Sequence, residues 1–305
     1  MVTGASTPPV YQGARGGAGG GRTNAAVPWH VHPLAVHAAA LLGTSPARAE
    51  PLAGGYMGPV LRVTLDDGRA VVVKGGASPP REAAMLRALA AAGAPTPEVR
   101  AVDERVLVLE ERPADGSLDD AWGDVGAVLA RLHDDAGAAA GAGATGRYGW
   151  VEDDAFGPLP IPNAWSDDWP SFWGERRLLA HVERLPSDVA RRVEALASDL
   201  PGRLPSRPRA ALVHGDLWSG NVLSSGGRVS ALIDPAAYVG HGEVDLAMLT
   251  LFASPDRRFF DAYGPDRDWA QRRPIYQLWH ALVHLQLFGE GYRGMVERLL
   301  GEAGV

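Results

Sequence analysis

The spacing of apolar residues in the first third of the chain predicts a small sheet with one main helix. Residues 60–65 and 70–74 are apolar runs on either side of Asp66-Asp67-Gly68, which is the pattern of a hairpin with a tight turn. Over residues 80–93 the apolar positions recur at helical spacing up to a closing glycine. Residues 106–109 form another apolar run and predict a further strand. We expect the ordered sheet to begin near Pro51.

The rest of the chain is mostly helical in period. Residues 125–133 carry their apolar side chains on one helical face, and residues 243–252 also predict a helix. Longer apolar helices are predicted over 268–288 and 292–300. Pro274 predicts a kink or a break, because proline lacks the backbone N–H that a helix interior needs. The fold class predicted is α+β, with a sheet-containing first part and a larger helical second part.

One loop between apolar runs carries the residues that point to chemistry. Asn221 follows Asp216 by five positions, and Asp234 follows Asn221 by thirteen. In phosphoryl transfer, one carboxylate orients the attacking hydroxyl and accepts its proton, while an Asn oxygen and a second carboxylate hold Mg²⁺ against the nucleotide phosphates. The catalytic segment of protein kinases has these residue types in this order. The pattern therefore predicts a catalytic base at Asp216 and magnesium ligands at Asn221 and Asp234.

These residue types also have an ordinary explanation. Asp, Gly, Ser and Asn are common in turns, so each of them alone indicates no more than a turn. A preference for turns does not explain the predicted strands around these residues. An apolar strand precedes Asp216, two strands are predicted over 222–224 and 229–233, and Asp234 stands at the exit of the last one. This strand-loop-strand context supports the catalytic interpretation.

Lys74 is the only lysine among the 29 Lys and Arg residues. Arg is used everywhere else, so the position that keeps Lys predicts a need for a compact ammonium group. Lys74 ends the predicted strand at 70–74, and Glu82 opens the next helix eight positions later. In kinases a strand lysine binds the α- and β-phosphates and is held by a glutamate of the next helix. We interpret Lys74 and Glu82 as this pair; the alternative is a solvated surface ion pair.

The segment after the strand at 106–109 predicts a linker between two lobes. On their order in the chain alone, Glu110, Glu111 and Arg112 are expected to offer main-chain amides to the adenine ring of ATP. Residues 1–28 are mostly Gly, Ala, Ser and Pro, which is typical of a flexible tail, and a short helix is predicted over 30–42. The predicted division is a tail at 1–28, a nucleotide-binding lobe at 29–112 and a helical lobe at 113–305.

Aromatic residues are concentrated at 148–173. Most of them are expected to pack in the core, with one or two contacting the substrate through their flat faces. Acidic residues at 152–154 and 167–168 would favour a substrate with a protonated amine. The other candidates for substrate contact are His214, Trp218 and Asp245, of which Asp245 could instead brace the loop.

Composition and charge exclude several classes of function. The formal net charge of -7 and the pI near 5.7 give no basic surface for DNA or RNA. The absence of cysteine excludes disulfides, Cys-ligated zinc and thiol catalysis. No run of about 18 apolar residues and no signal-like N-terminus is present, so we expect a cytoplasmic enzyme without a membrane span.

Several motifs together resemble the fructosamine kinase (ketosamine-3-kinase) family, over about residues 51–300. They are YGW at 148–150, PN at 162–163, HGDLWSGN at 214–221, IDPA at 233–236, YVGH at 238–241, EVDLAM at 243–248 and RPIYQL at 273–278. The family is similar in fold to aminoglycoside phosphotransferases and, more distantly, to protein kinases. It phosphorylates the 3-hydroxyl of ketosamines, the adducts that form when sugars glycate amines.

The resemblance implies a bilobal protein-kinase-like fold and an ATP- and Mg²⁺-dependent kinase for a ketosamine or glycated amine, in protein deglycation or ketosamine metabolism. It implies the roles given above for the catalytic and nucleotide-binding residues, and it adds Gly54 and Gly55 as the turn that covers the phosphates. That turn departs from the family pattern: residues 54–59 are GGYMGP, where family members usually have Gly-Gly-Cys or Gly-Gly-Ser. Dimerisation through a thiol in this turn is excluded here.

Two other functions are compatible with the same residues. A kinase for aminoglycosides or another amino-alcohol would share the chemistry of Asp216 and differ only in its pocket. A nucleotide-binding pseudokinase is compatible with the altered glycine turn, although the retained site residues argue against it; metal-dependent ATP turnover would separate the two. A protein kinase is disfavoured, because Asp245 follows Asp234 by only eleven positions and no peptide-docking segment fits between them.

Overall fold

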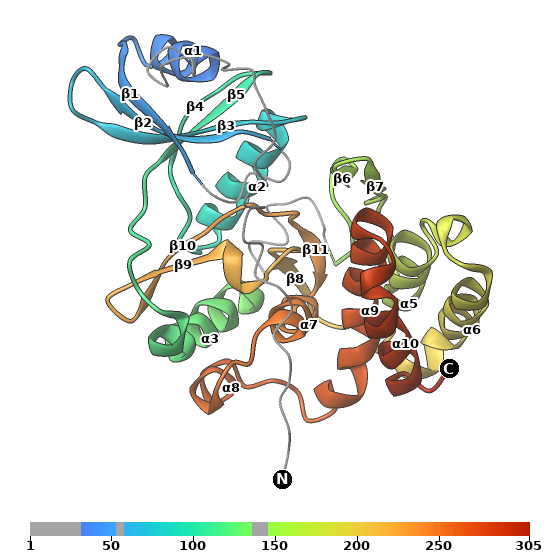
Figure 1. Ribbon diagram of the computed structural model, residues 1–305. Coiled ribbons are helices and arrows are strands. Elements are labelled where there is room, and N and C mark those ends of the chain that lie inside the picture. Colours follow the sequence, from blue (N-terminus) through green and yellow to red (C-terminus); the bar gives the residue numbers. More distant parts are fainter. Residues whose placement is uncertain (1–31, 53–57, 136–145) are drawn as a thin grey trace, which may run out of the picture.

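The computed structural model describes residues 32–52, 58–135 and 146–305. Figure 1 shows a small N-terminal lobe built on a sheet and a larger, mostly helical C-terminal lobe, which is the α+β, two-lobed arrangement expected from the sequence. The elements of the N-terminal lobe are α1 (Pro33–Leu41), β1 (Pro46–Pro51), β2 (Val60–Leu65), β3 (Ala70–Gly75), α2 (Pro79–Ala91), β4 (Val99–Val102) and β5 (Val106–Glu110).

The N-terminal sheet is antiparallel, with strand order β1-β2-β3-β5-β4. Alternate side chains of β5 face opposite sides of the sheet. Val106 and Val108 pack in the cluster that contains the alanines of α1, whereas Leu107 and Leu109 pack with Ala83 and Leu86 of α2. Figure 1 shows these two helices on opposite sides of the sheet. Because both faces are covered, β5 is apolar at four consecutive positions.

Strands β2, β3 and β5 confirm the predicted strands to within one residue. The sheet begins earlier than expected, because β1 starts at Pro46 and not near Pro51. β1 and β4 are the edge strands of the sheet. β1 buries a single side chain, that of Ala49, so it lacks the apolar alternation that identifies a strand.

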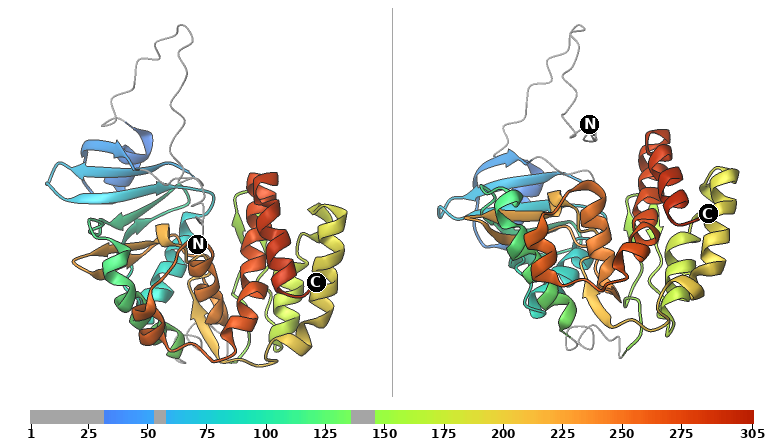
Figure 2. Two further views of the ribbon diagram at one scale, coloured as in Figure 1. Left: turned by 60° about the horizontal axis from the view of Figure 1, so that its bottom comes forward. Right: turned by 90° about the horizontal axis from the view of Figure 1, so that it is seen from below.

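The C-terminal lobe surrounds three short antiparallel strand pairs with helices. Its elements are α3 (Leu118–Asp134), β6 (Asp154–Phe156), β7 (Leu159–Ile161), α5 (Trp169–Trp173), the π-helical turn η2 (Gly174–Leu178), the 3₁₀ turn η3 (Val182–Arg184), α6 (Ser187–Arg203), β8 (Ala210–Val213), η4 (Ser219–Asn221), β9 (Val222–Ser225), β10 (Arg228–Leu232), β11 (Tyr238–His241), α7 (Glu243–Phe252), α8 (Arg257–Tyr263), α9 (Trp269–Phe288), η5 (Glu290–Tyr292) and α10 (Arg293–Glu302). Figure 2 shows α9 and α10 beside α6, on the side of the lobe away from α3.

The helices predicted over 243–252, 268–288 and 292–300 are present as α7, α9 and α10. α9 runs without a break through Pro274, which lies in its second turn and removes one backbone hydrogen bond without ending the helix. α3 begins seven residues before the predicted 125–133, at Leu118, after an N-cap at Ser117. None of the helices in the described part of the chain is long and apolar enough to cross a bilayer.

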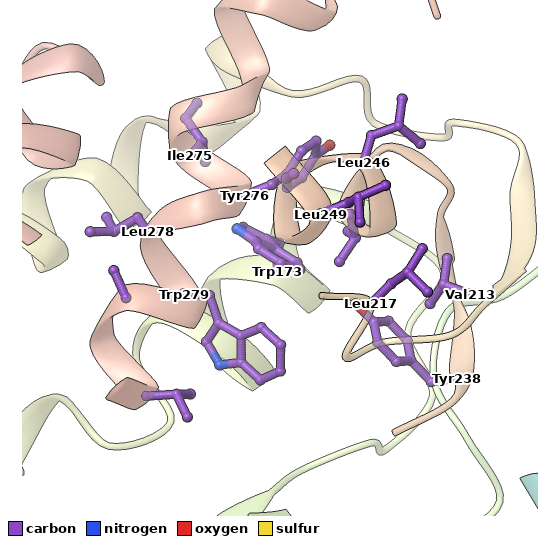
Figure 3. Close-up of a cluster of buried hydrophobic side chains, with 14 of the residues drawn as sticks. Trp173, Val213, Leu217, Tyr238, Leu246, Leu249, Ile275, Tyr276, Leu278 and Trp279 are labelled. Carbon is purple, nitrogen blue, oxygen red and sulfur yellow. The ribbon is translucent and has the colours of Figure 1, made fainter. Parts of the chain in front are cut away.

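The aromatic segment forms part of the core of the C-terminal lobe. Trp169, Phe172 and Trp173 are at most 1% exposed. Figure 3 shows Trp173 among side chains of α7 and α9, next to Tyr276. The indole N–H of Trp169 donates to the Tyr276 hydroxyl at 2.9 Å, so this buried polar group has a partner. The expectation that most of these aromatic side chains pack in the core is confirmed.

Candidate active site

The pairing of four short strands brings the two key carboxylates together. The loop that carries Asp216 leaves β8, the chain returns through the β9–β10 hairpin, and β11 then pairs antiparallel with β8. The segment after β8 and the segment before β11 are therefore adjacent, which places Asp216 near Asp234. Gly215 is required where they cross, because its φ is +83° and a Cβ there would lie 2.0 Å from the Ala236 carbonyl oxygen.

Asn221 fixes the loop from inside. Its Nδ2 donates to the Asp216 carbonyl oxygen at 2.8 Å and lies 3.3 Å from the Asp216 carboxylate oxygen Oδ2. The same nitrogen is 3.5 Å from the Asp234 carbonyl oxygen. Asp234 has a φ of 53°, the only positive φ at a non-glycine position in the described residues. Such a conformation is maintained only when the surroundings determine it, which is common in functional sites.

Lys74 reaches this loop from the N-terminal lobe. Its Nζ lies 2.5 Å from Glu82 Oε1 and 2.6 Å from Asp234 Oδ1. The side chain is 15% exposed. Burial alone would lower the pKa of Lys74, but the carboxylates of Asp234 and Glu82 raise it above its ordinary value. Lys74 is therefore a charged ammonium group that connects the two lobes at the centre of the site.

The carboxyl group of Asp216 has an unusual acidity. Burial raises the pKa of Asp216 to about 7; the negative charge of Asp234 adds to this effect and the hydrogen bond from Asn221 opposes it. A carboxylate with a raised pKa is a stronger base than one in water, so it is suited to accept a proton from a hydroxyl. A cation bound beside it would shift this pKa down again.

Asp245, in the first turn of α7, holds the beginning of the catalytic loop, residues 214–221, which carries Asp216 and Asn221. Its carboxylate accepts hydrogen bonds from the backbone amides of His214 at 2.7 Å and Gly215 at 2.9 Å. His133 Nε2 lies 3.1 Å from the same carboxylate, and the Tyr263 hydroxyl is 3.0 Å from His133 Nδ1. Burial would raise the pKa of Asp245, but the hydrogen bonds from His133 and the loop outweigh it and lower the pKa. The brace is therefore an ionised carboxylate.

Comparison with known proteins assigns this chain to a family. The family model described as "Fructosamine kinase" matches residues 47–303. The chain belongs to the fructosamine kinase family. It is 36% identical over 268 residues to a Thermus thermophilus protein classed as a ketoamine kinase, a match that covers 83% of this chain and 92% of that protein. Matches to several other ketoamine kinases are shorter and span 52% to 66% of their length.

Solved structures agree with this membership. The chain superposes with a TM-score of 0.79 on a Thermobifida fusca protein assigned as a fructosamine-3-kinase, at 31% identity, covering 88% of this chain and 98% of that one. An aminoglycoside phosphotransferase, solved as a thermostable variant with ADP and hygromycin B, has the same fold at a TM-score of 0.63 and 18% identity, with 90% and 99% covered. Its family makes this chain a kinase, and its fold is shared with an aminoglycoside phosphotransferase.

The structure brings together the main residues predicted from sequence for this kinase. Asp216 and Asn221 lie on the loop between β8 and β9, Asp234 lies in the segment between β10 and β11, and Lys74 contacts Asp234 from 160 positions away. The side chains of Asn221 and Asp234 would each bind a metal ion through an oxygen atom, and Mg²⁺ prefers oxygen ligands. The described residues contain no group of three or more His, Cys, Asp or Glu side chains that could enclose a metal. The donor set therefore suits a magnesium ion that is also held by phosphates and water.

Two of the residues predicted to contact substrate have other roles in this kinase. His214 and Asp245 have no exposed surface, so the prediction that they contact substrate is wrong. The His214 ring is bound to the Ile233 carbonyl oxygen at 2.8 Å, and Asp245 braces the loop. Trp218 is 42% exposed beside Asp216 and stays a candidate. Its ring covers Gly220, where a Cβ would lie 2.3 Å from the indole.

The linker residues agree only in part with their predicted role. The Glu110 amide donates to the Glu98 carbonyl oxygen at 2.9 Å, so it is not free to pair with adenine and the prediction is wrong for this amide. For the amides of Glu111 and Arg112 it stays a prediction. Gly54 and Gly55, predicted to cover the phosphates, lie outside the described residues.

The side chains of the linker have a structural function. Arg112 donates to the Ser230 carbonyl oxygen from Nη2 at 2.7 Å and from Nε at 3.0 Å, which ties the linker to β10. Glu111 accepts hydrogen bonds from Arg62 of β2 at 2.5 and 3.0 Å. The linker is thus fastened to both lobes.

Proposed function

We propose that this protein transfers the γ-phosphoryl group of ATP, with Mg²⁺, to the 3-hydroxyl of a small-molecule ketosamine. The observation that carries the proposal is that two adjacent segments, before β9 and after β10, bring Asp216, Asn221 and Asp234 together, with Lys74 Nζ 2.6 Å from Asp234 Oδ1. Phosphoryl transfer depends mainly on positioning and charge stabilisation, and these groups can supply both. Membership of the fructosamine kinase family supports the choice of acceptor.

Each residue of the site would have a distinct task. Asp216 would orient the acceptor hydroxyl and take up its proton as the new O–P bond forms. Lys74, held by Glu82, would exchange its contact with Asp234 for the nucleotide phosphates. Asn221 and Asp234 would hold Mg²⁺, which stabilises the charge of the phosphate oxygens when it is bound. The Asp245 brace keeps the loop in the geometry that these tasks require.

The surroundings of the site suit an acceptor with a protonated amine. Asp154 is a partly buried carboxylate, 15% exposed, whose charge contributes to the raised pKa of Asp216. A ketosamine carries a secondary amine that would be attracted by these negative charges. Trp218 offers an exposed flat face for the sugar. The choice of the 3-hydroxyl rests on family membership.

An aminoglycoside or another amino-alcohol is the second candidate acceptor. It is favoured by the fold shared with an aminoglycoside phosphotransferase that was solved with hygromycin B. Both classes of acceptor combine amines with hydroxyls, so the base at Asp216 does not separate them.

A coupled assay of ADP release tests the proposal. With ATP and Mg²⁺, we expect turnover of N-alkylated fructosamines and little turnover of aminoglycosides, and we expect chelation of the metal to stop the reaction. Turnover of aminoglycosides alone would establish the second candidate. Absence of metal-dependent ADP release with every acceptor would indicate a nucleotide-binding pseudokinase.

Replacement of Lys74 by Arg should reduce activity clearly while the protein stays folded. The site encloses a single ammonium nitrogen between two carboxylates at 2.5 and 2.6 Å, and the longer planar guanidinium would displace the phosphates. Steady-state kinetics with varied ATP, together with the thermal unfolding midpoint, would measure this effect. Normal kinetics in Lys74→Arg would show that the single lysine of the chain is a compositional accident.

A further inference from the structure

A second contact between the lobes lies next to the Lys74–Glu82 pair. Arg81 lies in the first turn of α2. Its Nε is 3.3 Å from Glu152 Oε2, and its Nη1 is 3.3 Å from Asp154 Oδ1. Asp154 begins the β6–β7 hairpin of the C-terminal lobe. Figure 1 shows this hairpin rising from the C-terminal lobe to the level of α2. Arg81 therefore joins the main helix of one lobe to a hairpin of the other, 73 positions away.

The hairpin is a fixed anchor for this contact. Asp153 directly precedes β6, and its carboxylate accepts a hydrogen bond from the backbone amide of Asn163 at 2.7 Å. Phe156, at the end of β6, packs against Trp279 of α9 with ring centroids 6.1 Å apart. The side chains of Arg81 and Asp154 are only 27% and 15% exposed, so their attraction is screened less than that of a surface pair.

The position of Arg81 on α2 links this contact to the nucleotide site. Arg81 directly precedes Glu82, and neighbouring side chains on a helix point about 100° apart. One of them therefore faces the hairpin while the other faces Lys74. The N-cap residue of α2, Ser78, makes no side-chain capping hydrogen bond, so the first turn depends on other contacts. Holding Arg81 therefore restricts the rotation of the turn that carries Glu82.

We propose that Arg81 is a positioning residue: by bridging α2 to the β6–β7 hairpin it keeps Glu82 and Lys74 in place for the nucleotide phosphates. This inference rests on the proposed function only in assigning Lys74 to the nucleotide. It does not depend on which acceptor is phosphorylated.

Binding of the non-hydrolysable nucleotide AMP-PNP with Mg²⁺, measured by calorimetry without acceptor, tests the proposal. We expect Arg81→Ala to weaken binding about fivefold to tenfold, which corresponds to about 1 to 1.4 kcal/mol. Arg81→Lys should lie between this variant and the unmodified protein, because it keeps the charge but not the fork. Arg87→Ala, at an exposed position of the same helix, should bind as the unmodified protein does. Thermal unfolding of each variant verifies that it is folded.

AMP-PNP affinity measured in a variant that lacks the two carboxylates facing Arg81 shows whether Arg81 acts through them. In Glu152→Gln/Asp154→Asn the partners of Arg81 are neutral, so Arg81→Ala should cause no further loss of affinity. A further loss of AMP-PNP affinity in this background would show that Arg81 acts on the nucleotide directly. Unchanged affinity in Arg81→Ala alone would show that Arg81 has no positioning role. Either result overturns the proposal. Failure to phosphorylate any ketosamine would leave this nucleotide readout unaffected and would count only against the proposed acceptor.

Discussion

Replacing Asp216 by Asn is expected to reduce turnover by about 10²- to 10⁴-fold while nucleotide binding stays intact. The amide has nearly the shape of the carboxylate but cannot take up the proton of the acceptor hydroxyl. The contacts of Lys74, and the side chains of Asn221 and Asp234, are left in place, so nucleotide and metal can still bind. Turnover from ADP release and AMP-PNP affinity from calorimetry measure the two effects separately.

The matched control for this variant is Asp199→Asn. Asp199 lies on α6, is 60% exposed and pairs with Arg203 on the same helix, so its replacement should leave turnover unchanged. If Asp216→Asn kept turnover within a few-fold of the unmodified protein, Asp216 would not be the base. If it lost nucleotide affinity as well, Asp216 would belong to the metal or nucleotide site instead.

Replacing Asp245 by Ala is expected to lower the free energy of unfolding by about 3 to 5 kcal/mol. The carboxylate has no exposed surface and accepts hydrogen bonds from the amides of His214 and Gly215. Its loss would leave these buried donors and the His133 ring without their acceptor. Urea denaturation followed by circular dichroism would measure the change.

Two further variants make this expectation specific. Asp245→Asn keeps one carbonyl oxygen as an acceptor and should therefore destabilise the fold less than Asp245→Ala. Asp261→Ala, at a 62% exposed position on α8, should change the free energy of unfolding by about 0.5 kcal/mol or less. A loss below about 1 kcal/mol in Asp245→Ala would contradict the bracing role.

The sequence predicted those elements and residues whose signal is local. The hairpin of β2 and β3 shows a tight turn between two apolar runs, and α7, α9 and α10 show helical period. Few residue types perform phosphoryl transfer, so their spacing, together with the predicted strands around them, suggested Asp216, Asn221 and Asp234 as one site.

Contacts between distant segments were not predictable from these patterns. His133 meets Asp245 across 112 positions and Arg81 meets Asp154 across 73, and neither pair has a local signature. Burial also depends on the whole fold: His214 and Asp245 stand near the catalytic loop in sequence, yet the lobe encloses both completely. Their assignment to substrate contact failed for this reason.

The helix α6 was missed although the sequence contained its signal. Val189, Val193, Leu196 and Leu200 recur at helical spacing and are all buried. Pro201, two residues before the helix ends, and the many charged residues of this segment obscured this pattern.

We propose that this kinase phosphorylates the 3-hydroxyl of a ketosamine, and phosphorus–proton correlation NMR of the product tests this proposal most directly. The protein would be incubated with ATP, Mg²⁺ and an N-alkylated fructosamine. We predict a phosphorus signal coupled to the H3 proton of the sugar. Coupling to any other sugar proton, or the absence of product from every ketosamine while an aminoglycoside reacts, would contradict the account.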